Sequence, residues 1–456
     1  MNREVTLSDV LAAREARVLR QQRLLSAFHT PVLSFSMNIA GPVKTSPAIE
    51  RAFRWGSERL LTGLAQNRLA VLTAEDIQAI TGPELTAAVQ ADALTLKRLC
   101  VAAEDETPLG RLFDMDVIGT DGQKIDRSAV GAGERGCIVC GKPGRDCASR
   151  RLHTVPELQA ATARLIQTHF AAVDAAQVAD IVTEALLREV YTTPKPGLVD
   201  LANTGSHRDM TVQTFEASAE ALRPYWRDCM RIGIETANAS APETFRLLRK
   251  RGLEAEHTML AATGGVNTHK GAIFLLGILC GAVGRLWMAE QPFASVESLC
   301  DESAAMTAPV LAEEWESIKA NPPKHLTTGQ RLYLEAGITG ARGESMGGFM
   351  TVRQFGLPVY RAARRSGLSE NDAAAVTLLH LLANGTDTNM IARGGFAVAA
   401  RATDAVRVLL QETPYPDTAQ IETLNASFVR QNLSPGGSAD LLAVTLLLEK
   451  LTNLNE

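Results

Sequence analysis

The sequence lacks an apolar run long enough to cross a membrane as a helix. Its most apolar stretch, AIFLLGILCGAVG, covers only residues 272–284, whereas a membrane-spanning helix needs about 20 residues. Lys270 and Arg285 flank it, and the four-residue spacing of Gly277 and Gly281 suits close helix packing. We therefore expect a buried core helix here rather than a transmembrane segment.

A secretory or transit signal is also missing from residues 1–25. The segment has no apolar core, and acidic residues stand among its arginines. Thr6 and Asp9 have the spacing of a capping box, and apolar residues follow with helical periodicity, which predicts an amphipathic helix. The 7 cysteines, an odd number, fit a reducing compartment better than a set of disulfides. We expect a cytoplasmic protein.

An excess of positive charge is absent as well. The chain has 46 Lys and Arg against 51 Asp and Glu, with a formal net charge of -5. This balance argues against nucleic acid as a partner and against electrostatic membrane binding. The 456 residues suffice for two or three domains.

Strand patterns are confined to the first part of the chain. Short candidates with strand composition occur at 31–39, 86–92 and 111–119, followed by a helical pattern at 153–170. After about residue 175, long stretches rich in Ala, Leu, Glu and Arg follow a helical period. We predict a multi-domain chain, with an α+β domain at 1–170 and a larger all-α domain at 175–456. The segment 171–177 is expected to be the seam between them.

Four polar, glycine-containing islands interrupt the helical second half, at 191–210, 264–271, 340–349 and 387–395. They combine basic side chains, carboxylates and residues that begin helices. A polyphosphate bound with Mg²⁺ needs this mixture, because cations and backbone N–H groups bind the oxygens and carboxylates hold the ion. The alternative is that the islands are ordinary helix caps and surface ion pairs.

The islands contain the motifs TPKPGLVD, NTGSHRDM, GVNTHKG, GARGE and DTNMIARGG. In this order they resemble the triphosphoribosyl-dephospho-coenzyme A synthases, from about residue 178 to the C-terminus. That family joins ATP to 3′-dephospho-coenzyme A, releases adenine and keeps the triphosphate. The resemblance implies substrate contacts from Lys195, Ser206, His207, His269, Lys270, Arg342, Asn389 and Arg393. It implies catalytic carboxylates at Asp200 and Glu344, and Mg²⁺ ligands at Asp200, Asp209 and Asp387. Which carboxylate is the general base stays open.

In the first half, Asp114 and Asp116 stand two residues apart among apolar residues. On a strand, such positions face the same side, so the two carboxylates would converge and could hold Mg²⁺. The alternative is a solvated strand edge or turn.

The segments LAAREARVLRQQRLL, GPVKTSP, PLGRLFDMDV and RGCIVC resemble the apo-citrate lyase phosphoribosyl-dephospho-coenzyme A transferases over about residues 5–165. That family moves the prosthetic group from the synthase product onto a serine of the citrate lyase acyl carrier subunit, releasing pyrophosphate. The resemblance implies a nucleotidyltransferase-type domain, catalytic and Mg²⁺-binding roles for Asp114 and Asp116, and phosphate contacts from Lys44 and Arg111.

A cysteine cluster follows the aspartate pair. Cys137, Cys140, Cys147 and His153 could bind zinc tetrahedrally, although their spacing is irregular for a zinc finger. The alternative is a group of packed free thiols at a strand–loop junction.

Both resemblances lead to one pathway, because the product of the second half is the substrate of the first. The expected function is therefore bifunctional synthesis and attachment of the citrate lyase prosthetic group. Three alternatives remain: an all-α metal-dependent nucleotide hydrolase, a non-catalytic module that binds a carrier protein, and the same chemistry serving malonate decarboxylase.

Overall fold

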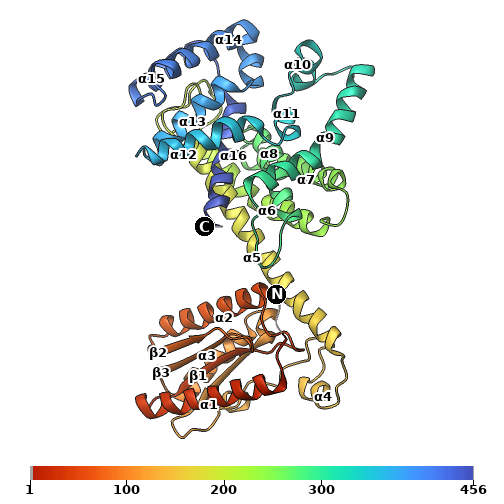
Figure 1. Cartoon of the computed structure of the whole chain (residues 1–456). Helices are drawn as coiled ribbons and strands as arrows, with labels where there is room; N and C mark the ends of the chain where they lie inside the picture. Colours follow the sequence, from red (N-terminus) through yellow and green to blue (C-terminus); the bar gives the residue numbers. More distant parts are fainter. Residues whose placement is uncertain (1–3, 455–456) are drawn as a thin grey trace. The chain divides into compact units, whose positions relative to one another are not determined.

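The computed structural model describes residues 4–454, and the chain divides into two compact units, Met1–Ala172 and Val173–Glu456 (Figure 1). The boundary lies inside α5 (Val155–Tyr191), one helix of 37 residues. We predicted a break between two helices at 171–177, and this prediction was wrong, because α5 continues through the segment. This alanine-rich segment contains no glycine or proline, so nothing in it opposes helix formation.

The first unit is built on an antiparallel sheet in the order β2-β3-β1-β4 (Figure 1). Its strands are β1 (Val32–Met37), β2 (Ala70–Ile77), β3 (Glu84–Gln90) and β4 (Phe113–Ile118), and its helices before α5 are α1 (Leu7–Phe28), α2 (Pro47–Gln66), α3 (Ala93–Asp105) and α4 (Gly144–Ser149). The predicted strands β1, β3 and β4 are confirmed. The predicted capping box at the start of α1 is also confirmed, since Thr6 and Asp9 exchange hydrogen bonds.

The two faces of the sheet differ in what they carry. On one face Phe35 of β1 stacks on Phe53 of α2 and meets Phe113 of β4 edge-on, which makes the aromatic core of this unit. On the other face Leu24 of α1 packs with Val32. Strand pairing places Asp114 opposite Ser36 and Asp116 opposite Ser34 on this second face. The sheet thus separates the aspartate pair from the aromatic core.

The outer edge of β4 is covered by side chains of α3. Lys97 donates to the carbonyl oxygen of Met115 at 2.8 Å, and Glu104 accepts from the Met115 N–H at 2.9 Å. Both charged groups are buried, and they satisfy backbone groups that an unpaired edge would leave open. This holds the strand that carries the aspartate pair in a fixed position.

The described residues of the second unit form helices and loops without a sheet (Figure 1). Its helices after α5 are α6 (Val212–Glu235), α7 (Ala241–Ala262), α8 (Lys270–Arg285), α9 (Val296–Ala320), α10 (Thr328–Ala336), α11 (Gly340–Met346), α12 (Leu357–Arg365), α13 (Glu370–Asn384), α14 (Thr388–Glu412), α15 (Thr418–Arg430) and α16 (Gly436–Asn453). The large helical unit that the sequence predicts is confirmed.

The apolar stretch predicted as a core helix is α8, whose residues 272–284 are almost all buried. Its glycines allow close packing: a β-carbon at Gly277 would collide with the Tyr225 hydroxyl, and one at Gly284 with the carbonyl oxygen of Met230. Helices α6 and α8 therefore approach at backbone distance. Their packing fixes the N-terminal end of α8, where several polar residues gather. Among residues 4–454, no helix combines the length and hydrophobicity that spanning a bilayer requires.

Candidate active sites

The second unit contains a cavity of about 880 Å³ to which all four polar islands contribute. This volume lies in the range of about 300–1,000 Å³ that is common for small-molecule sites. The predicted site residues that line it are Lys195, His207, Asp209, His269, Lys270, Glu344, Asn389 and Arg393. Segments far apart in sequence are thus brought to one place.

His269 precedes α8 and is 4% exposed. Its Nδ1 lies 2.7 Å from the Ser218 hydroxyl, which in turn accepts a hydrogen bond from Thr268 at 2.8 Å. Burial, followed by the charge of Lys195, lowers the pKa of His269 to about 3, so the imidazole is neutral near pH 7. A buried Ser218 hydroxyl that donates to Nδ1 leaves the proton on Nε2, and this atom has no protein partner among residues 4–454. His269 therefore lines the cavity as a neutral imidazole whose Nε2–H is buried.

Lys195 is held in a buried ion pair rather than extended on its loop. Its Nζ donates to the side chain and to the backbone carbonyl of Glu189, both at 2.6 Å, and the residue is 1% exposed. An ammonium has three N–H donors, so one remains for another acceptor. Glu189 was not predicted as a site residue, because it occupies an ordinary position in the helical pattern of α5.

Asp440, on α16, is a half-buried carboxyl that was not predicted from the sequence. Burial, followed by the charges of Glu189 and Asp387, raises the pKa of Asp440 well above its usual range. Asp440 lines the cavity together with Ser434, Gly436, Gly437 and Ser438. The glycine pair at the start of this apolar helix was the available signal, since backbone N–H groups at a helix start can bind anions.

One wall of the cavity carries a hydrogen-bonded group of three side chains. Arg393 donates to Nδ1 of His207 at 3.3 Å, and the other ring nitrogen of His207 lies 2.8 Å from the Ser434 hydroxyl. Burial, followed by the charge of Arg393, lowers the pKa of His207. With Nδ1 accepting, Nε2 carries the proton and donates to Ser434. The arrangement fixes the direction of the arginine and keeps the histidine neutral.

Glu344 lies on α11 and also lines the cavity. Its carboxylate accepts hydrogen bonds from the hydroxyl and the N–H of Thr351. Burial raises the pKa of Glu344 above its ordinary value despite these bonds. A carboxylate with a raised pKa is a better proton acceptor, which suits general-base chemistry.

Four predicted site residues do not line this cavity: Asp200, Ser206, Arg342 and Asp387. The Asp200 carboxylate accepts hydrogen bonds from the backbone N–H groups of Lys195, Ala202 and Asn203. These bonds stabilise its own loop. The Ser206 hydroxyl donates to the carbonyl oxygen of Leu433.

Arg342 lies over the ring of Trp315, 5.1 Å from its centroid. Asp387 caps α14 with one oxygen and accepts from the N–H and hydroxyl of Ser438 with the other. The predicted set Asp200, Asp209 and Asp387 is therefore not gathered around one ion. Short polar residues near helix starts often satisfy backbone groups, and Asp200 and Asp387 do so here.

The first unit has a separate cavity of about 980 Å³, lined by Asp114 and Asp116. Both project from the same face of β4, as predicted from their spacing. Loss of hydration in this hollow, followed by repulsion from Asp116, raises the pKa of Asp114. Lys124 forms an ion pair with Asp116 at 2.7 Å. Two carboxylates on one face of a strand form a group suited to Mg²⁺.

Arg111, Arg127 and Arg135 are three of the five arginines that line the same cavity. Burial, followed by the charges of the other two, lowers the pKa of Arg111. Arg127 and Arg135 pair with the buried Glu104, which holds their side chains in place. Guanidinium groups that repel one another favour an anion among them. Lys44, also a predicted phosphate contact, does not line the cavity, because its ammonium donates to the carbonyl oxygen of Ile39.

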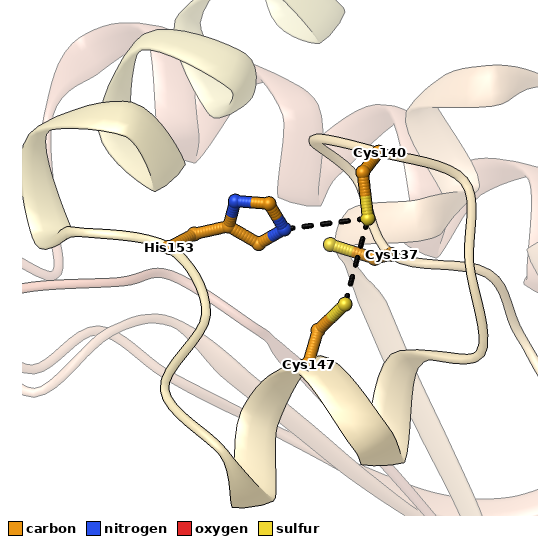
Figure 2. Close-up of side chains that lie close together, drawn as sticks. All are labelled: Cys137, Cys140, Cys147 and His153. Carbon is orange, nitrogen blue, oxygen red and sulfur yellow. Dashed lines mark hydrogen bonds between the residues drawn. The ribbon is translucent and has the colours of Figure 1, made fainter.

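Three members of the cysteine cluster, Cys137, Cys147 and His153, line this cavity. Figure 2 shows them together with Cys140. Cys140 Sγ lies 3.5 Å from Cys147 Sγ and 3.3 Å from His153 Nε2. With Cys137, the ligand atoms all lie within 4.8 Å of one another. Across residues 4–454 this is the only group of three or more His, Cys, Asp or Glu side chains close enough to share a metal ion.

Comparison with known proteins divides the chain in the same order. Residues 5–169 match the family described as apo-citrate lyase phosphoribosyl-dephospho-CoA transferase, and residues 175–456 match ATP:dephospho-CoA triphosphoribosyl transferase. Protein CitXG of Haemophilus influenzae is 34% identical over 97% of this chain and 96% of its own length. Protein CitXG of Leuconostoc mesenteroides subsp. cremoris is 31% identical over 98% and 97%.

A third relative covers the second half alone. The 2-(5''-triphosphoribosyl)-3'-dephosphocoenzyme-A synthase of Pectobacterium atrosepticum is 43% identical over 59% of this chain and 86% of its own length. Because two family matches and two full-length relatives agree, the chain belongs to the CitXG family and is a bifunctional transferase of citrate lyase prosthetic-group biosynthesis.

Proposed function

We propose that the two cavities catalyse consecutive reactions, with a synthase domain at 175–456 and a nucleotidyltransferase-type transferase domain at 1–170. The first reaction joins ATP to 3′-dephospho-coenzyme A and releases adenine. The second transfers the phosphoribosyl-dephospho-coenzyme A group to a serine of the apo acyl carrier subunit of citrate lyase. The observation that carries this proposal is the convergence of all four polar islands on one cavity, with the aspartate pair in a separate one.

In the synthase reaction, the bond between adenine and the ribose anomeric carbon breaks, and a bond from that carbon to the 2′-oxygen of dephospho-coenzyme A forms. The 2′-hydroxyl loses a proton, and the departing adenine gains one. We assign Glu344 as the proton acceptor, since burial raises its pKa while it lines the cavity. Asp440, whose pKa is raised well above its usual range, is the proposed proton donor to adenine.

The triphosphate stays intact in this reaction, so the site must bind it without cleaving it. The proposed contacts are Arg393, Lys270, the remaining N–H of Lys195, the neutral Nε2–H of His269 and the backbone N–H groups at the start of α16. Asn389 and His207 lie beside them. Asp209, which also lines the cavity, is the proposed Mg²⁺ ligand of this site.

In the transferase reaction, the carrier serine oxygen attacks the phosphorus next to the ribose, the bond to pyrophosphate breaks, and the serine proton is released. Mg²⁺ held by Asp114 and Asp116 would neutralise charge on the phosphate oxygens. Arg111 and its two neighbouring arginines are placed to bind the leaving pyrophosphate. The sheet face that carries the two aspartates keeps them directed at one point.

The test is mass spectrometry of a reaction containing the protein, Mg²⁺, ATP, dephospho-coenzyme A and an apo-carrier. We expect free adenine, and a carrier whose mass increases by one phosphoribosyl-dephospho-coenzyme A group. The apo-carriers of citrate lyase and malonate decarboxylase are compared in parallel, and the citrate lyase carrier should be loaded faster. Release of phosphate or of ADP without adenine would contradict the proposal and indicate a nucleotide hydrolase.

A further inference from the structure

The four side chains of the cysteine cluster come from three consecutive pieces of backbone (Figure 2). Cys137 and Cys140 lie on a tight loop, Cys147 lies on α4, and His153 lies in the segment between α4 and α5. All four point toward one centre. The proposed transferase chemistry uses none of them.

The distances fit a tetrahedral zinc site. Zinc binds thiolate sulfur at about 2.3 Å and imidazole nitrogen at about 2.0–2.1 Å, which puts neighbouring ligand atoms about 3.5–3.8 Å apart. The observed separations are 3.5 Å for the Cys140 and Cys147 sulfurs and 3.3 Å for Cys140 sulfur and His153 Nε2. We propose that this cluster binds one structural zinc ion through Cys137, Cys140, Cys147 and His153.

The backbone around Cys137 is formed in the way such a site requires. The Val139 N–H lies 3.4 Å from the Cys137 sulfur, and the Gly141 N–H donates to the Cys137 carbonyl oxygen at 2.9 Å. Gly141 has a positive φ of 73°, which turns the chain back after the second cysteine. Gly136 and Pro143 then pair across the base of the loop. These contacts hold the loop in one conformation.

Binding of the ion has a defined charge balance. Three thiols release their protons to solvent and the imidazole binds in its neutral form, so the zinc and its ligands carry one net negative charge. Basic residues of the same segment, Lys142, Arg145, Arg150 and Arg151, lie near in sequence to offset it. Four protein ligands complete the coordination shell, which makes the site structural rather than catalytic.

The role of the ion follows from what the loop contacts. The carbonyl oxygen of Gly136 accepts from Arg111, while Arg135 donates to the carbonyl oxygens of Phe113, at 2.6 Å, and Gly110. Arg135, two residues before Cys137, is thus hydrogen-bonded to the first residue of β4, next to Asp114. Zinc would hold this loop in place, and the loop lines the cavity that contains Asp114 and Asp116.

The experiment measures the metal in the untagged full-length protein purified from zinc-supplemented medium. Elemental analysis should find about one zinc per chain. Replacing zinc by Co²⁺ should give the visible and near-ultraviolet bands of a tetrahedral cobalt–thiolate centre. Cys140→Ser and His153→Gln should each lower the zinc content at least tenfold under mild chelation, whereas the matched changes Cys300→Ala and His325→Gln should not.

Limited proteolysis gives a second readout that does not depend on folding of a variant. Chelation of the wild-type protein should open residues 133–153 to cleavage while adenine release by the second unit continues. The proposal is overturned if the wild-type protein holds no zinc, or if Cys140→Ser retains it. It is equally overturned if Cys140 and Cys147 are found joined as a disulfide in protein purified under reducing conditions and handled in air.

Discussion

The carboxyl of Asp440 rests directly against Gly271: a β-carbon built on Gly271 would lie 1.9 Å from Asp440 Oδ2. Gly271 is in the first turn of α8. Only the absence of a side chain there lets the carboxyl of α16 reach the start of α8. This contact joins the segment after Ser434 to the island around His269, which makes one site from two distant parts of the sequence.

Gly271→Ala should therefore displace Asp440 and slow adenine formation by about tenfold or more, the effect of about 1.4 kcal/mol in the barrier. Transfer of an intermediate made beforehand should continue at the wild-type rate. Gly329→Ala is the matched control, because its β-carbon meets nothing within 4 Å. Unchanged adenine formation in Gly271→Ala would show that the position of Asp440 does not matter.

Breaking the buried ion pair of Lys195 and Glu189 should lower the free energy of unfolding. Removing one partner of a buried pair leaves an uncompensated charge and costs about 3–5 kcal/mol. We expect Lys195→Met to lower the urea midpoint of the helical circular dichroism signal strongly. The double change Lys195→Met with Glu189→Gln should recover part of that loss. Lys319→Met, at an exposed ion pair, should have little effect. If the double change is no more stable than Lys195→Met, the buried pair is not the cause.

The buried imidazole of His269 should make the free energy of unfolding depend on pH. Its pKa falls from 6.5 to about 3 on folding, so the unfolded chain takes up the proton first as the pH decreases. The contribution of the neutral imidazole to the free energy of unfolding is complete above pH 6.5. It decreases as the pH falls toward 3, by up to about 1.4 kcal/mol per pH unit. His269→Gln should remove this part of the slope in urea unfolding between pH 6.5 and pH 5, whereas exposed His325→Gln should keep it. Equal slopes in all three proteins would contradict the buried neutral imidazole.

Asp114→Asn tests the transferase cavity. Losing one of the two facing carboxylates should weaken Mg²⁺ binding and slow carrier loading at least about a hundredfold, because a bound metal supplies several kcal/mol of charge stabilisation. Adenine release should be unchanged. Asp76→Asn, on an exposed part of β2, is the control. Carrier loading at the wild-type rate over a Mg²⁺ titration would remove Asp114 from the site.

The sequence predicted features that depend on local spacing. The two-residue interval of Asp114 and Asp116 put both on one face of a strand, and the polar islands marked the loops that line the synthase cavity. Features that depend on packing were missed. Glu189 and Asp440 occupy regular helical positions, and only the packing of distant helices makes Glu189 buried and Asp440 half-buried. Asp200 and Asp387 were predicted as metal ligands, yet nearby backbone N–H groups use their oxygens. β2 was missed because its residues are largely exposed and lack a clear alternation.

The most direct test of two consecutive reactions in two separate sites is complementation between variants. Glu344→Gln should stop adenine release, and Asp114→Asn should stop carrier loading, so neither protein alone should load a carrier from ATP and dephospho-coenzyme A. Glu335→Gln, at an exposed position of α10, serves as the control for the first change. Mixed together, the two inactive proteins should load the carrier, because the intermediate made by one can be used by the other. A mixture that releases adenine but leaves the carrier unloaded, or a single variant that loads it alone, would contradict the account.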